Sequence, residues 1–303
     1  MKHRKFTNEK TAVAGVIEAL LIIGLVAIVL SYIQFAYIPV IMDQKEADHM
    51  DQVSNQFAQL KSTIEVQSMM GTLGTGEPIT YTPISSPITL GSKELPYFIS
   101  ARSYGQINLI DQDDAGDYKI DILPAPADFP SGISLTSIKY EAENYYFVDQ
   151  TYVLEGGGIV LKQPGEGEVM RVNPGISVEN NSDVGNIEIR YFIPLFTGIP
   201  GKKVHGGWED CYIHTNYITD YSYSGSATFI RIYTDYPYAW NDSLVNESRG
   251  ILREYYDNGY INVQLDDTVT PNMVEITPGS KSINIELTIV EVGVQVGPGY
   301  IPQ

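Results

Sequence analysis

An apolar run near the N-terminus constrains this chain more than any other feature. Residues 12–33 are apolar, small or uncharged, and Glu18 is the one exception. As a helix, this run would extend about 33 Å, close to the roughly 30 Å hydrocarbon thickness of a bilayer. It therefore predicts a transmembrane helix over residues 12–33, with a carboxylate a few residues inside a segment suited to lipid.

The charges on the two sides of this run differ. Residues 1–10 hold four of the 19 Lys and Arg and one of the 37 Asp and Glu, whereas the chain from Asp43 onward has 15 basic and 35 acidic residues. The positive-inside rule then predicts a cytoplasmic N-terminus and an extracellular body. A cleaved secretory signal is the alternative, but the run is longer than a usual h-region and no A-x-A site follows it. A body of net charge −20 repels phosphate backbones, so nucleic acid is not an expected partner.

An amphipathic pattern continues beyond the apolar run. Apolar residues recur at spacings of three and four, which predicts a stalk helix over residues 34–70 with one apolar stripe. The stripe consists of Met50, Val53, Phe57, Leu60 and Ile64. We expect one long helix over residues 12–70, bent at Pro39 and ended by Gly71–Pro78. The stripe could pack on the chain's own C-terminal domain or on neighbouring subunits.

The segment "KTAVAGVIEALLIIGLVAIVL" resembles the N-terminus of archaeal type IV pilin-like surface proteins. The resemblance implies that residues 1–11 are a basic leader removed by a membrane prepilin peptidase, with Lys10, Thr11, Ala12 and Val13 as the processing region. It also implies that Glu18 pairs with the new N-terminal amine of an adjacent subunit during assembly. Without such a partner, Glu18 would reach water near the cytoplasmic headgroups by itself.

The chain after residue 70 is predicted to be a linker followed by a β-rich domain. Residues 71–96 are rich in Pro, Ser, Thr and Gly and are predicted to be a linker. From residue 97 to 303, short alternating runs are separated by turn residues, which is typical of antiparallel sheets. One helix is expected within residues 241–259, with Asp242 or Ser243 as its N-cap and Gly259 at its end. The predicted fold class is α+β: a long N-terminal helix followed by an antiparallel β-sandwich-like domain.

Two clusters carry potential metal ligands. Asp111, Asp113 and Asp117 could wrap a cation, but the spacing fails the EF-hand pattern, and we interpret the segment as a hairpin loop. His205, Cys211 and His214 could hold zinc, but a strand would point Cys211 and His214 to opposite faces. We interpret this second segment as a hairpin loop beside a buried cysteine. No metal and no cofactor is expected.

Three sequons begin at Asn180, Asn241 and Asn246, and they suggest a glycosylated, exposed body. The glycine-rich "EGGGIVLKQPGEGE" is interpreted as turns between strands and not as a phosphate cradle. No constellation of catalytic residues stands out, so an enzyme is not expected.

Two functions remain open. The first is a pilin-like structural subunit or minor pilin that self-associates through its N-terminal helix, either in the cell membrane or in an extracellular filament. The second is a monomeric, single-pass anchored module that binds envelope carbohydrate or protein.

Overall fold

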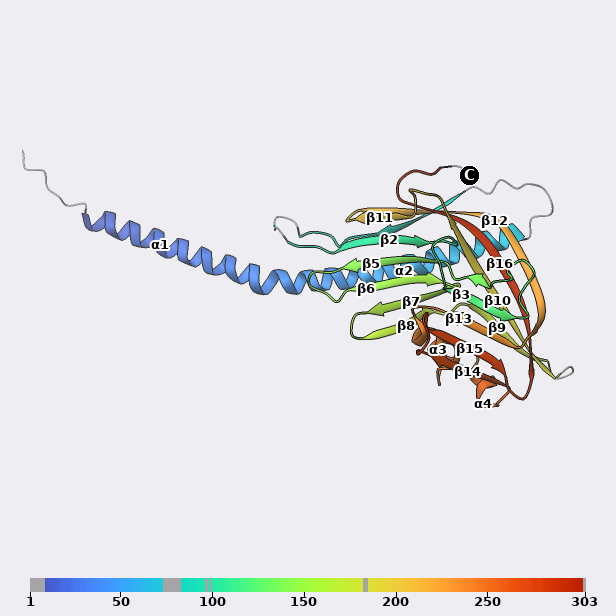
Figure 1. The fold of residues 1–303 in the computed structure, drawn as a ribbon. Helices are drawn as coiled ribbons and strands as arrows, with labels where there is room; N and C mark the ends of the chain where they lie inside the picture. The colour runs from blue at the N-terminus through green and yellow to red at the C-terminus, as the bar shows by residue number, and fades with distance from the viewer. Residues whose placement is uncertain (1–8, 73–82, 96–97, 99, 182–184, 302–303) are drawn as a thin grey trace, which may run out of the picture.

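The N-terminal helix is continuous over the whole of its predicted length, residues 12–70. The computed structural model describes residues 9–72, 83–95, 98, 100–181 and 185–301, with side chains from Ala14 onward. The helix comprises α1 (Glu9–Tyr32), the π-helical turn η1 (Ile33–Tyr37) and α2 (Ile38–Thr72). Figure 1 shows α1 projecting away from the β-rich domain, whereas α2 lies within it.

The predicted bend coincides with the π-helical turn. Pro39 has no backbone N–H, and its ring would clash with the carbonyl one turn earlier in a regular helix. The chain widens there instead, because the N–H of Ile38 donates to the carbonyl of Ile33. In Figure 1 the helix changes direction where α1 gives way to α2.

Three sheets form the domain. The first, sheet A, has the order β1-β12-β16-β10-β9, and its strands are Ile84–Thr89, Asp210–Ala227, Ser282–Val296, Asn186–Gly198 and Gly175–Asn181. Sheet B has the order β11-β2-β5-β6-β7-β8, and its strands are Val204–Gly207, Tyr104–Ile110, Ser137–Glu143, Gln150–Glu155, Gly158–Gln163 and Gly167–Val172. Sheet C has the order β14-β15-β13-β3-β4, and its strands are Ile261–Asp266, Met273–Pro278, Phe229–Tyr233, Lys119–Leu123 and Ile133–Ser134. Two short helices, α3 (Pro237–Val245) and α4 (Arg253–Asp257), precede β14.

The predicted apolar stripe on the stalk helix is confirmed. All five of its side chains are at most 2% exposed. They share one core with residues of sheets A and B, so of the two possible partners for the stripe, the chain's own domain is the one observed. Phe57 packs against Tyr140 and Tyr152 of sheet B, with ring centroids 6.3 and 5.9 Å apart. This burial fixes α2, and therefore the direction of α1, relative to the domain.

A second core lies beneath sheet C and the short helices. It joins Trp240 and Leu244 of α3 to the inner residues of β10, β13 and β16. The hairpin between β6 and β7 turns at Gly156 and Gly157, both with positive φ, as expected of a type I′ turn. The interpretation of this glycine-rich segment as a turn is therefore confirmed.

The α+β class is confirmed, and four details differ from the sequence-based predictions. Residues 84–89 of the predicted linker form β1, which pairs with β12 at the edge of sheet A, where Pro87 is tolerated. Residues 111–117 join sheets B and C and are not a hairpin loop. The expected helix within residues 241–259 is two helices, the first beginning at Pro237 and not at Asp242 or Ser243. Finally, β10 and β16 pair in parallel within otherwise antiparallel sheets.

Candidate functional site

The described part of α1 is an apolar surface with nothing packed on it. Its large side chains are strongly exposed; Leu21 and Ile28, for example, are both 69% exposed. The helix is long and apolar enough to cross a membrane, and none of its most apolar window is buried. An unpartnered apolar surface of this extent marks a site of contact with lipid or with other protein chains.

Glu18 is the one charged side chain on this surface from Ala14 to Met42. It is exposed, and no hydrogen bond or ion pair joins it to another residue that the structure describes. The predicted processing residues Lys10, Thr11, Ala12 and Val13 belong to α1 by their backbone, but their side chains lie outside the described part, as do residues 1–8 of the leader.

A buried carboxylate anchors a loop to the start of α2. Glu46 is fully buried and accepts hydrogen bonds from the backbone N–H groups of Tyr145, Tyr146 and Phe147, at 3.2, 2.7 and 2.7 Å. These three residues belong to the loop between β5 and β6. The sequence contains a signal for this contact, because Glu46 lies four residues after Met42 and four before Met50, on the buried stripe.

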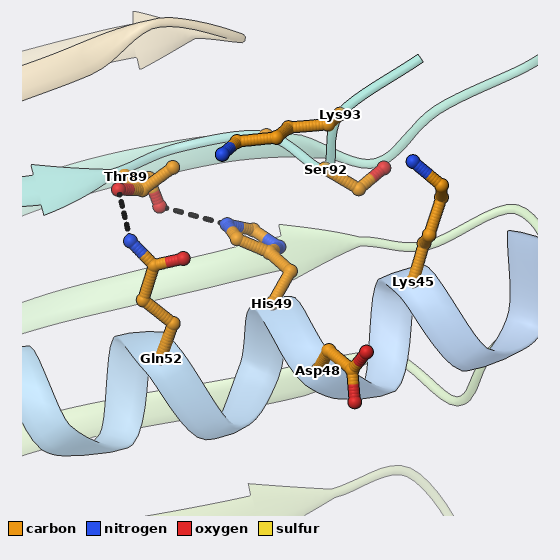
Figure 2. Close-up of a pocket in the computed structure, with 8 residues that line it drawn as sticks. Lys45, Asp48, His49, Gln52, Thr89, Ser92 and Lys93 are labelled. Carbon is orange, nitrogen blue, oxygen red and sulfur yellow. Dashed lines mark hydrogen bonds between the residues drawn. The ribbon is translucent and has the colours of Figure 1, made fainter. Parts of the chain in front are cut away.

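A polar cleft opens beside the same part of α2 (Figure 2). It has a volume of about 340 Å³ and is lined by Lys45, Asp48, His49, Gln52, Thr89, Gly91, Ser92 and Lys93. His49 Nε2 donates to the carbonyl of Thr89 at 2.9 Å, and Gln52 donates to the Thr89 hydroxyl at 3.0 Å. Burial lowers the pKa of His49, and the Thr89 hydrogen bond opposes that effect only in part, so His49 is neutral at pH 7.

Among the residues that the structure describes, the two lysines of this cleft have no carboxylate partner. No ion pair joins Lys45 or Lys93 to an acid within the described residues, although acids outnumber bases in the domain. Figure 2 shows Lys45 rising from α2 toward Ser92, and Lys93 extending above His49 toward Thr89. Two unpaired ammonium groups beside hydroxyl groups form an arrangement that suits an oxyanion such as a phosphate group.

Exposed aromatic residues adjoin the polar cleft. Trp208 is 49% exposed and Tyr145 is 70% exposed. The Trp208 ring packs edge-on against Tyr104, with centroids 5.5 Å apart, and Arg102 lies 5.4 Å from its centre. With Glu143 and Asn144, these four side chains line a second cleft of about 510 Å³. Hydrogen bonds between Ser92 and Ser103 tie the two clefts together.

The predicted acidic cluster is dispersed. Asp111 is buried and pairs with Lys203 at 2.6 Å, whereas Asp113 and Asp117 are exposed. Burial by itself raises the pKa of Asp111, but Lys203 and the N–H groups of Gly198 and Asp114 outweigh it and hold the pKa below its usual value. The Asp111 carboxylate thus holds the loop between sheets B and C.

The three residues considered as zinc ligands are also separated, and the segment that holds them is not a hairpin loop, because β11 and β12 belong to different sheets. Cys211 is buried, whereas His205 lies on β11 of sheet B and His214 hydrogen-bonds to Ser85 at 2.6 Å. Within the residues described, no group of three or more His, Cys, Asp and Glu side chains is placed to hold a metal ion.

The sequon asparagines occupy different environments. Asn180 is exposed on β9, and it accepts a hydrogen bond from Lys281. Asn241 lies within α3, where the hydroxyl of Ser243 from the same sequon is buried and bonded to Asn173. Asn246 donates to Asp242 at 2.6 Å.

Comparisons with known proteins give this chain no relatives: no protein-family model, no curated protein and no solved structure matches it. The most distinctive features of the described part of the chain are therefore the apolar helix and the clefts at its junction to the domain.

Proposed function

We propose that this protein is a type IV pilin-like subunit that is anchored through α1 and self-associates through the same helix once its leader is removed. The observation that carries the proposal is the bare apolar surface of α1 on a helix whose second half, α2, forms the core of the domain. Such a helix presents its apolar surface at a fixed orientation. A bilayer covers that surface first, and copies of the same helix cover it after assembly.

Glu18 supplies specificity in this account. A carboxylate among apolar helices is costly unless it is paired, so a neighbour with a cation in register is favoured over other alignments. Cleavage after Ala12 or after Val13 would make Glu18 the sixth or fifth residue of the mature chain. The new amine of an adjacent subunit then supplies the cation.

The alternative is a monomeric anchored module, and one observation favours it. A span of 20 residues beginning at Ala19 ends at Ile38, the first buried residue of the helix. That span measures about 30 Å, which matches the hydrocarbon thickness. Glu18 would then lie just outside the hydrocarbon and would need no partner from another chain.

Two substitutions at Glu18 and the identity of the most N-terminal peptide distinguish the pilin-like subunit from the monomeric module. In cells that express the protein, we expect Glu18→Leu to reduce the sheared, sedimentable surface fraction by at least about tenfold, because removal of one member of a buried ion pair costs about 3–5 kcal/mol. The matched Glu18→Asp variant keeps the charge and should retain part of that fraction. Mass spectrometry of the most N-terminal peptide should show a start at Ala12, Val13 or Ala14. An intact Met1 terminus with equal sedimentation of all variants would overturn the proposal.

A further inference from the structure

The end of the domain from which α1 leaves combines aromatic and cationic side chains, of which Lys93, Tyr145 and Trp208 are exposed and Lys45, Arg102 and Tyr104 are half-buried. We call this surface the domain base and define it as Lys45, Lys93, Arg102, Tyr104, Tyr145 and Trp208. These residues come from five segments, each of which contacts at least one of the others, and His49 of α2 bonds to Ser103. Glu46 binds the loop that carries Tyr145, Ser92 bonds to Ser103, and a Cβ on Gly91 would lie 2.9 Å from the backbone of Trp208.

We propose that the domain base rests on the bilayer surface, with its aromatic rings among the lipid headgroups and its lysines against their phosphates. The inference rests on the membrane anchoring part of the proposed function and not on assembly.

The length of the helix places the domain base near the level of the lipid headgroups. If the span begins after Glu18, it leaves the hydrocarbon near Ile38, where the helix first enters the domain. Lys45 follows seven residues later, about 10 Å along the axis, and its Cα–Cβ bond tilts toward the N-terminal, membrane-facing side of the helix. The headgroup layer on each side is roughly 5–8 Å thick, so an extended lysine reaches it.

The chemistry of the base suits that layer. Trp and Tyr are enriched where one side of a ring meets hydrocarbon and the other meets water. Tyr32, Phe35 and Tyr37 are 69%, 81% and 53% exposed, and they lie about 9, 5 and 2 Å along the helix on the membrane side of Ile38. The base therefore extends an aromatic belt that the helix itself begins.

The contacts that hold the backbone of the domain base also favour the bilayer surface as its partner. Trp208 is held by Tyr104 and Arg102, and the backbone of Tyr145 is held by a fully buried carboxylate. The side chains stay exposed although their backbone is fixed, which is the arrangement of a preformed contact surface. The bilayer is the partner that must lie beside it when α1 spans a membrane.

Intrinsic fluorescence provides a direct test, because Trp208 is the exposed tryptophan and Trp240 is fully buried. The full chain is incorporated at one copy per nanodisc of phosphatidylcholine and phosphatidylglycerol, with and without headgroup spin-labelled lipid. We expect the spin label to quench the Trp208 emission by at least about half, as for a ring at the headgroup level. The Trp208→Phe variant, which retains Trp240, should show little quenching.

A displaced tryptophan serves as the matched control. Tyr256 is 40% exposed on α4, a helix that lies at the lower edge of the domain and away from the point where α1 leaves it (Figure 1). In the double variant Trp208→Phe/Tyr256→Trp, acrylamide should quench the new tryptophan and the spin-labelled lipid should not.

Three results would overturn the inference. The first is incorporation into discs with Trp208 open to acrylamide and insensitive to the lipid label. The second is shielding of Trp208 that occurs only when several copies share a membrane, which would identify a second copy of the chain as the occupant. The third is failure to incorporate at all, which would overturn the anchoring itself and is recognised by flotation.

Discussion

Glu155 is a single carboxyl group placed in the apolar part of the domain, at the end of β6. It is fully enclosed, and one of its oxygens accepts hydrogen bonds from Thr234 Oγ1 and Trp240 Nε1, both at 2.7 Å. Burial raises the pKa of Glu155 to about 7, although the two hydrogen bonds act in the opposite direction. The native state therefore holds a proton near neutral pH that the unfolded chain releases.

This proton makes a testable difference to stability. Between the unfolded pKa of 4.5 and the folded value of about 7, the native state binds more protons than the unfolded state, so stability falls as the pH rises. The loss amounts to at most roughly 3 kcal/mol by pH 8. Denaturant unfolding in detergent at pH 5 and pH 8 should show this loss in the wild type and a smaller one in Glu155→Gln. Equal pH dependence of the two proteins would contradict the assignment.

For single residues, the sequence predicted which side chains face the core better than it predicted what those side chains bind. Glu46 and His49 lie on the buried side of an amphipathic helix, and their spacing from Met42, Met50 and Val53 was visible in the sequence. Their partners were not visible, because the loop bound by Glu46 is about 100 positions away along the chain. Contacts of this kind depend on how sheet B lies against α2.

At the scale of the elements, the clearest contact is the one by which Glu46 of α2 holds the β5–β6 loop. We expect Glu46→Ala to leave three backbone N–H groups of the β5–β6 loop without an acceptor, and each buried orphan donor costs about 1–3 kcal/mol. Hydrogen exchange at Tyr145, Tyr146 and Phe147 should then accelerate by at least about tenfold, because the loop opens more often.

Asp48→Asn is the matched control for this loop, since Asp48 is exposed two residues away on the same helix. Its exchange pattern should match that of the wild type. Unchanged exchange in Glu46→Ala would show that the loop is held by other contacts.

Elements with a regular period were predictable, and their pairing was not. The stalk stripe repeats at the helical period, so the sequence was sufficient to locate it. The parallel pairing of β10 with β16 joins residues 186–198 to residues 282–294, and period-two alternation is the same for parallel and antiparallel strands. At the break between α3 and α4 the chain folds back on the end of α3, and the Ile251 N–H donates to the Ser243 carbonyl, a bond that the helical period does not predict.

At the scale of the whole molecule, the chain combines an acidic β-rich domain with an apolar helix that continues without a break into α2 of that domain. The domain buries one half of the helix and leaves the other half for a bilayer or for other copies. The domain base lies at the junction of these two environments. The apolar surface of α1 is thus the part of the molecule on which the proposed anchoring and the proposed self-association both depend.

Cysteine cross-linking along α1 in native membranes tests this claim most directly. The native Cys211 is a suitable silent background, because it is buried, and burial raises its pKa to about 11. We expect single Cys substitutions at Ile22 and Leu25, which are 55% and 63% exposed, to give a ladder of cross-linked multimers. Ser248→Cys, in the exposed segment after α3, should give monomer.

The pattern along the helix decides between the two functions. A ladder from α1 positions, reduced by the additional change Glu18→Leu, is the result that self-association predicts. Monomer at every α1 position, in membranes where the protein is fully incorporated, would contradict it and would leave the monomeric anchored module as the function of this chain.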